Sequence, residues 1–121
     1  MLERELRLSL NIIIISTEVR GNDLAVVYVF FNNFAHANLE NANFKNTKLR
    51  NASFYSANLT NADLSGADLR KTSLINADLS NANLSGADLS GADLSGADLS
   101  GASINENTIL KCINHPICLD E

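Results

Sequence analysis

The chain has 121 residues, a length that suits a single domain, and 45% of its residues are hydrophobic, which argues against wholesale disorder. Two cysteines are too few to build a disulfide scaffold. The formal net charge of -5 disfavours direct nucleic-acid binding, and no apolar run reaches the roughly 20 residues of a membrane-spanning helix.

The N-terminal segment, residues 1–31, contains two apolar runs, Ile12–Ile15 and Val26–Phe31. One interpretation is a β-hairpin that turns near Gly21 and caps the rest of the fold. We favour the other interpretation, a degenerate form of the five-residue pattern described below, which begins at about Thr17. In that frame the apolar positions are Val19, Leu24 and Val29.

The first residues allow two further readings. Leu2–Leu10 fits a short strand or helical turn over the end of the fold. A signal peptide over Met1–Ser16 is the rival, and Glu3, Glu5 and the lack of a small-residue cleavage motif count against it.

A five-residue repeat fills the middle of the chain, from residue 32 to residue 110. Each block has a large apolar residue at its centre, and a small residue stands two positions earlier, Ala in 12 of 16 blocks. Two positions after the centre, 11 of 16 residues are Asn or Gly. The centres are Phe34, Leu39, Phe44, Leu49, Phe54, Leu59, Leu64, Leu69, Leu74, Leu79, Leu84, Leu89, Leu94, Leu99, Ile104 and Ile109.

A period of five fits neither a helix nor a plain strand. Steps of five rotate an apolar position by about 140° on an α-helix, and on a strand they alternate between its two faces. A turn must therefore fall inside every block, and the Asn or Gly position supplies it because both residues tolerate a left-handed backbone. Each block becomes a short extended piece plus a corner, with the centre and the small residue pointing inward.

These blocks resemble the pentapeptide-repeat family, whose motif is A(D/N)LXX. The resemblance implies an all-β fold, a right-handed quadrilateral β-helix (a solenoid) of about four coils, with capping segments at both ends. We expect residues 32–110 to form the β-helix, residues 1–31 the N-terminal cap and residues 111–121 the C-terminal cap. The resemblance also suggests a cyanobacterial source.

The C-terminal segment allows three arrangements of its sulfur and imidazole groups. Asn107 or Thr108 is positioned to cap a short helix that would lie across the last coil and stop before Pro116. Cys112 and Cys118 are either joined in a disulfide or left as two free buried thiols. With His115 they also form a C-x2-H-x2-C pattern that would hold part of a zinc site, although we expect no metal and no cofactor.

Charge is distributed unevenly along the repeat. Between Asn41 and Lys71 there are five bases, and from Thr72 to Asn107 there are five acids and no base. With 20 residues per coil, Asp68 would lie under Asp88 and Asp78 under Asp98. We take the acidic half as the candidate interaction surface, formed by Asp78, Asp88, Asp93 and Asp98.

These features predict a protein that is not an enzyme. The Asp and Ser residues sit at positions that the repeat dictates, and a filled bore leaves no cavity for a substrate. We expect a protein-interaction or regulatory module with an unidentified protein partner, as a monomer or an end-to-end dimer. The resemblance implies one alternative, a DNA mimic that binds a DNA topoisomerase. We expect the protein in the cytoplasm, with the periplasm or thylakoid lumen as alternatives.

Overall fold

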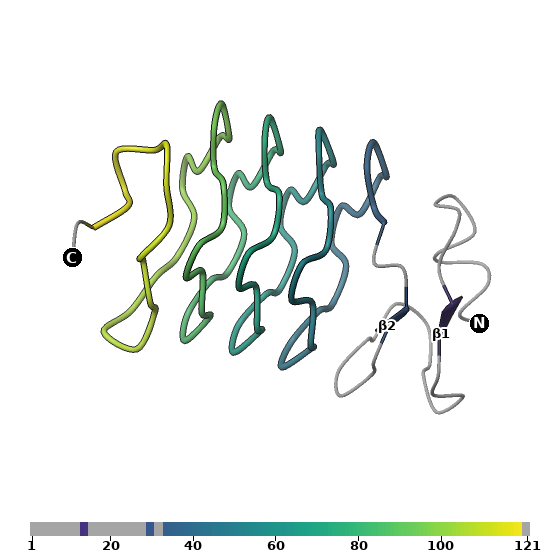
Figure 1. The fold of residues 1–121 in the computed structure, drawn as a ribbon, viewed down its shortest axis with the longest axis horizontal. Coiled ribbons are helices and arrows are strands. Elements are labelled where there is room, and N and C mark those ends of the chain that lie inside the picture. The colour runs from purple at the N-terminus through teal and green to yellow at the C-terminus, as the bar shows by residue number, and fades with distance from the viewer. Residues whose placement is uncertain (1–12, 15–28, 31–32, 120–121) are drawn as a thin grey trace.

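The computed structural model describes residues 13–14, 29–30 and 33–119 of the chain. Residues 33–119 wind into a four-sided stack of coils (Figure 1). The pairings between coils are parallel bridges, and all but one join residues 20 positions apart. Four five-residue blocks therefore make one turn of the stack. The fold is the right-handed quadrilateral β-helix that the resemblance implied.

The bridges define four sides of the stack. On each side, equivalent residues of successive coils lie above one another with outward side chains. Side 1 carries Asn33, Ser53, Ser73 and Asp93; side 2 carries Asn38, Asn58, Asp78 and Asp98; side 3 carries Asn43, Asp63, Asn83 and Ser103; side 4 carries Lys48, Asp68, Asp88 and Ile109.

Backbone hydrogen bonds tie each coil to both neighbours. The amide of Leu59 donates to the carbonyl of Asp78 in the next coil at 2.7 Å, and the amide of Asn58 donates to the carbonyl of Ala37 in the previous coil at 2.9 Å. This is the pairing of a parallel sheet, spread over short segments. No coil is a complete unit alone, since its amides need the coils on either side.

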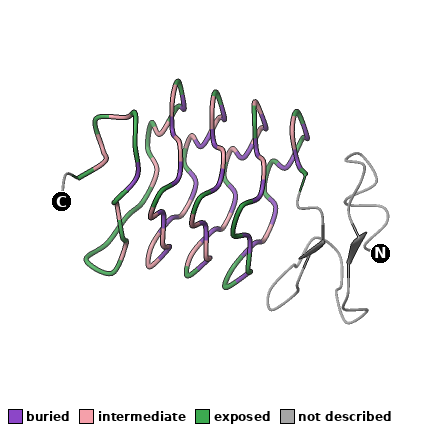
Figure 2. Cartoon of the chain, in the orientation of Figure 1, coloured by how far each residue is buried: buried purple, intermediate pink, exposed green. Residues whose placement is uncertain are grey.

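The bore is filled by the two inward positions of each block. Every centre from Phe34 to Leu94 is at most 3% exposed, and the alanines between Ala37 and Ala97 are at most 8% exposed. Figure 2 shows the buried residues recurring once around each corner of the stack. Alanine is required because large side chains from four sides already occupy a narrow square.

Three phenylalanines fill the bore at its N-terminal end. The rings of Phe34 and Phe54 stack in parallel with centroids 4.9 Å apart, and Phe44 meets both rings edge-on. The larger side chains thus occupy the coil that lies nearest the N-terminal segment. Such ring pairs add roughly 0.5–1.5 kcal/mol beyond the area they bury.

The corners are tight turns. The amide two positions before each centre donates to the carbonyl of the preceding centre, as Ala62 does to Leu59 at 3.0 Å. The residue two positions after each centre, from His36 to Gly101, has a positive φ in every block. This combination is that of a type II β-turn. The sequence prediction that Asn and Gly mark left-handed corners is confirmed.

Three corners use a residue less suited to this backbone, namely His36, Ser56 and Lys71, with φ of 62°, 54° and 59°. A left-handed conformation costs an ordinary side chain roughly 1 kcal/mol. We predict that Lys71→Asn stabilises the protein by about 0.5–1 kcal/mol, because asparagine tolerates this region. The converse change at an equally exposed corner, Asn81→Lys, is expected to destabilise by a similar amount. Urea denaturation followed by circular dichroism measures both, and equal signs for the two changes would contradict the prediction.

The residue before each centre stabilises the same corner from outside. The side-chain oxygen Oδ1 of Asp78 accepts the amide of Ser80 at 3.0 Å and the Ser80 hydroxyl at 2.5 Å. The same pair of bonds recurs at Asp88–Ser90, Asp93–Ser95 and Asp98–Ser100. The Asp-x-Ser pattern is therefore a turn device, in agreement with a structural reading of these residues.

The last coil departs from the regular register. Asp88 pairs with Ile109, 21 positions away, so one extra residue lies between residues 103 and 109. A slip of one residue turns a side chain to the opposite face. Ile109 is consequently 41% exposed, and Leu110 packs against the core in its place.

The prediction that Ile104 and Ile109 face inward as buried centres is therefore wrong. Ile104 is 42% exposed although its neighbour Ser103 keeps the 20-residue register. No further coil is bridged above it in the part of the chain that the structure describes. Below the extra residue, Thr108 replaces a backbone partner, since its hydroxyl donates to the carbonyl of Leu84 and accepts the amide of Gly86.

The predicted C-terminal helix is also wrong. Ile109 and Ile113 both pair with the previous coil, so the chain remains extended there. The segment then turns back at Asn114, whose φ is 67°, and the amide of Leu119 donates to the carbonyl of Leu110 at 2.7 Å. Extended pairing satisfies the open backbone groups of the coil below, which a helix would leave unpaired.

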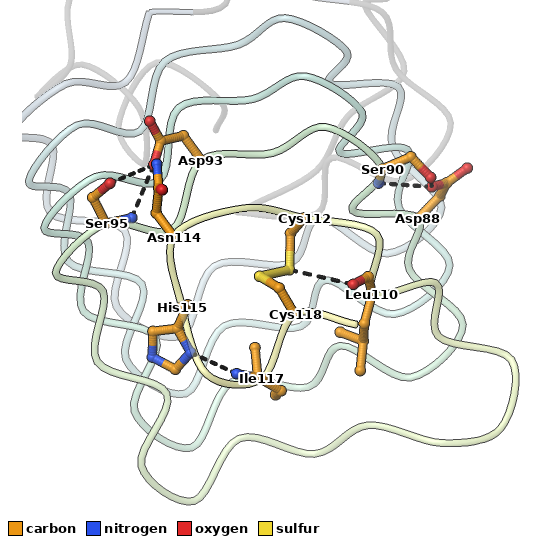
Figure 3. Close-up of a disulfide and its surroundings, with 10 residues drawn as sticks. All are labelled: Asp88, Ser90, Asp93, Ser95, Leu110, Cys112, Asn114, His115, Ile117 and Cys118. Carbon is orange, nitrogen blue, oxygen red and sulfur yellow. Dashed lines mark hydrogen bonds between the residues drawn. A yellow bond between two sulfur atoms is a disulfide. The ribbon is translucent and has the colours of Figure 1, made fainter. Parts of the chain in front are cut away.

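Cys112 and Cys118 form a disulfide with Cα atoms 5.0 Å apart. Cys112 is 6% exposed and occupies the small-residue position above Ala92, while Ile117 and Cys118 pack against the core. In Figure 3 the bond lies across the last turn of chain, beside Leu110.

We predict that reduction loosens this end without unfolding the coils below it. A disulfide that closes a short loop contributes roughly 2–3 kcal/mol, and here it holds only residues 112–118 to the last coil. Hydrogen exchange of the amides at Ile113 and Cys118 should speed up in reducing buffer, while the amides of Leu64 and Leu79 should not change. The Cys112→Ala/Cys118→Ala variant serves as the control, since the reductant should not alter its exchange.

Near the N-terminus the structure contains strands β1 (Ile13–Ile14) and β2 (Val29–Phe30). They pair in antiparallel fashion, with Ile13 opposite Phe30 (Figure 1). This pairing agrees with the hairpin interpretation and not with Val29 as a repeat centre, because the coils pair in parallel. The turn near Gly21, the repeat frame from Thr17, and the readings of Leu2–Leu10 and Met1–Ser16 lie outside the described residues.

Candidate interaction surface

The four acidic residues of the predicted surface do not lie together. Asp88 belongs to side 4, Asp93 to side 1, and Asp78 and Asp98 to side 2. Figure 3 shows Asp88 and Asp93 on different sides of the last coils. The predicted stacking of Asp68 under Asp88 and of Asp78 under Asp98 is confirmed. A single flat partner contacts at most the Asp78–Asp98 pair and one neighbouring side.

Local hydrogen bonds occupy one oxygen of each of these carboxylates. The Ser80 hydroxyl and amide lower the pKa of Asp78, and the Ser100 hydroxyl and amide do the same for Asp98. The pKa of Asp93 is lowered by Ser95 and by the Asn114 side-chain amide, which donates to Asp93 at 3.0 Å. These carboxylates therefore stay ionised and bonded to the corners throughout the neutral range.

These lowered pKa values predict acid sensitivity. A group whose pKa is depressed in the folded state stabilises the fold above its unfolded pKa, about 3.9 for Asp, and the stabilisation is lost as pH falls through the folded value. We expect the free energy of unfolding to stay level from pH 7 to about 5 and to fall below about pH 4. Asp78→Asn should flatten part of that fall, because the amide oxygen still accepts the corner hydrogen bonds at any pH. Urea denaturation at pH 7 and pH 3 measures the effect, and Lys45→Gln is the control that should leave the pH dependence unchanged.

The structure rearranges the basic residues as well. Lys48 lies on side 4, and Arg50, Arg70 and Lys111 follow one another along the corner between sides 4 and 1, where Lys71 also lies. Of the bases in residues 33–119, Lys45 alone lies elsewhere. The bases therefore form one edge that runs along the stack, rather than one basic half. The spacing of 20 between Arg50 and Arg70 was the sequence signal for this arrangement.

Arg70 is a surface residue that the sequence reasoning did not single out. Its Nε and Nη2 atoms donate to the two carboxylate oxygens of Asp68 at 2.7 and 2.6 Å. Its Nε atom also lies 3.9 Å from the Asp88 carboxylate, so it separates the two stacked acids. This fork lowers the pKa of Asp68 and holds the guanidinium in one orientation.

The zinc interpretation of the C-terminal segment does not fit the structure. Both thiol groups are consumed by the disulfide, and His115 uses its Nδ1 atom to accept the amide of Ile117 at 3.1 Å. Within residues 13–14, 29–30 and 33–119, no three Cys, His, Asp or Glu side chains gather as metal ligands.

Comparison with known families identifies the chain. The family described as pentapeptide repeats matches residues 33–66 and 62–101 with eight copies, which is more than half of the sequence. The protein therefore belongs to the pentapeptide repeat family. No curated protein matches the sequence significantly.

Solved structures of the same family are similar to it. A pentapeptide repeat protein of the Arabidopsis thaliana thylakoid lumen is 33% identical, with a TM-score of 0.51, over 69% of this chain and 66% of that one. One from the cyanobacterium Cyanothece 51142 is 34% identical, with a TM-score of 0.54, over 63% of this chain and 55% of its own length. One from Nostoc PCC 7120 is 38% identical, with a TM-score of 0.51, over 63% of this chain and 71% of that one.

The described part of the chain was also compared with the requirements of a membrane span. None of its helices has the length and apolar character to cross a bilayer.

Proposed function

We propose that this protein is a non-enzymatic interaction or regulatory module that presents a rigid repeat surface to a protein partner. The observation that carries the proposal is the filled bore, in which the centres from Phe34 to Leu94 are at most 3% exposed. A ligand must therefore meet the outer surface. The outer carboxylates and hydroxyls are engaged in corner hydrogen bonds, which is a structural use rather than a catalytic one.

Co-purification at native expression levels tests this proposal. We expect one protein to co-elute in a fixed ratio through two orthogonal purification steps. The control is the same tagged protein with its bore disrupted by Leu79→Asp, which should lose the partner together with the fold. A protein that elutes alone from both steps would contradict the proposal.

The alternative, a DNA mimic that binds a topoisomerase, has weaker support. Mimicry of a duplex needs a long, continuous negative surface, and here the acids are divided among the sides while bases follow one corner. A supercoiling assay separates the two functions, since a mimic would inhibit the enzyme and the module proposed here would not.

The disulfide bears on the compartment. Disulfides persist where conditions are oxidising, so the bond between Cys112 and Cys118 favours the periplasm or thylakoid lumen over the cytoplasm. Alkylation of freshly lysed native cells, followed by mass spectrometry, should find both cysteines unlabelled before reduction. Complete labelling without reductant would favour the cytoplasm.

A further inference from the structure

Side 1 differs from the other sides in its outward residues. Where the repeat normally places Asp or Asn, side 1 has Ser53 and Ser73 in its middle coils. The Ser53 hydroxyl reaches the amide of Tyr55 only at 3.4 Å, against about 3.0 Å for most of the Asp and Asn residues. The middle of this side is therefore flat and uncharged, with less support for its corners.

The two corners that border side 1 also carry the least favourable backbone residues. In residues 33–119, the left-handed positions that are neither Asn nor Gly are His36, Ser56 and Lys71. Lys71 lies at the corner shared with side 4, and the other two lie at the corner shared with side 2. Departures from local rules that bring no stability are most often found at functional sites.

The same two corners carry side chains that suit recognition. One corner has Arg50, Arg70 and Lys71. The Arg70 side chain is 42% exposed, and two of its five N–H groups are engaged by Asp68, which leaves three directed elsewhere on a fixed guanidinium. The other corner has Tyr55, which is 41% exposed and packs edge-on against His36 at 5.5 Å, with Ile75 in the next coil.

We infer that side 1, between Ser53 and Ser73, is the docking face, and that it binds an acidic protein segment that carries an apolar side chain. The carboxylates of such a segment would pair with the basic corner, and its apolar group would cover Tyr55 and Ile75. An extended residue spans about 3.3 Å, so the two corners are about 13 Å apart, which a segment of four or five residues bridges. Arg and Tyr are the residue types that contribute most to protein interfaces.

Charge complementarity selects this partner over a nucleic acid. Asp68 and Asp88 on side 4 and Asp93 at the end of side 1 surround the basic corner with carboxylates. A strand with a phosphate on every unit would meet these acids, whereas a protein segment can place its few carboxylates only where the bases lie. The inference rests on the proposed function and assigns it a face and a partner chemistry.

A random 12-residue peptide library displayed on phage, selected on the immobilised full chain, tests the inference. We expect the selected peptides to be enriched in Asp and Glu with an aromatic or aliphatic residue. Their affinity should fall about tenfold with Tyr55→Ser and about tenfold with Arg50→Gln/Lys71→Asn, and stay unchanged with Lys45→Gln, a base off this corner. Circular dichroism of each variant verifies that it is folded.

Three results would overturn the inference. Peptides that are lost with Asp78→Asn/Asp98→Asn but kept with Tyr55→Ser would place the docking face on side 2 and leave the proposed function standing. Tighter binding of a 12-nucleotide oligo(dT) than of any selected peptide would assign the basic corner to nucleic acid. A library that yields no binding peptide at all would count against the interaction module itself.

Discussion

Replacing Leu79 with aspartate is expected to unfold the coils. Leu79 is fully buried in the middle of the bore, where its neighbours are other centres and alanines. Loss of a buried leucine side chain costs roughly 2–5 kcal/mol, and a buried carboxylate without a partner adds several more. The sum reaches the total stability of an ordinary domain, about 5–15 kcal/mol. Circular dichroism and size-exclusion chromatography should show an unfolded or aggregated chain.

The matched control for this change is Asn81→Asp. It adds the same charge two residues away, at an exposed corner whose left-handed backbone aspartate tolerates. We expect its free energy of unfolding to lie within about 0.5 kcal/mol of the parent protein. If Leu79→Asp unfolds as cooperatively as Asn81→Asp, the inward orientation of the centres is refuted.

Phe54→Ala is expected to destabilise the protein by about 3–5 kcal/mol. Phe54 is fully buried, stacks on Phe34 and meets the edge of Phe44. Removal of the ring leaves a cavity that rigid neighbouring coils cannot close, because each is held by backbone pairing on both sides. Urea denaturation monitored by circular dichroism measures the loss.

Tyr55 provides a control of similar size in the next position. Its side chain is 41% exposed at a corner, so Tyr55→Ala should cost no more than about 0.5 kcal/mol. Nearly equal losses for the two aromatic residues would show that the alternation of inward and outward positions is incorrect at this block. A larger loss for Phe54 confines the stability to the bore and leaves Tyr55 available for binding.

Much of the candidate surface could be predicted only in part. The outward direction of Asp78 and Asp98 and their stacking follow from the five-residue block and a coil of 20 residues. Their separation from Asp88 and Asp93 becomes visible only when consecutive blocks are assigned to different sides. The fork between Arg70 and Asp68 also depends on the corner conformation, which sets the direction of an arginine two residues after the acid.

The two ends could not be predicted because their registers depend on long-range pairing. A single extra residue between Ser103 and Ile109 exchanges Ile109 for Leu110 in the core. Nothing in the local pattern distinguishes the two, since both are apolar. At the other end, antiparallel pairing of β1 with β2 excludes Val29 as a repeat centre, although its spacing matched the frame.

The sequence by itself determined the inward residues and the left-handed corners of the repeat, because both follow from the side-chain chemistry within one five-residue block. The tertiary structure alone decided which outward residues share a side, where the register slips, and which residues border side 1. Those outcomes depend on hydrogen bonds between residues about 20 positions apart, and such bonds form only when successive coils have closed and stacked.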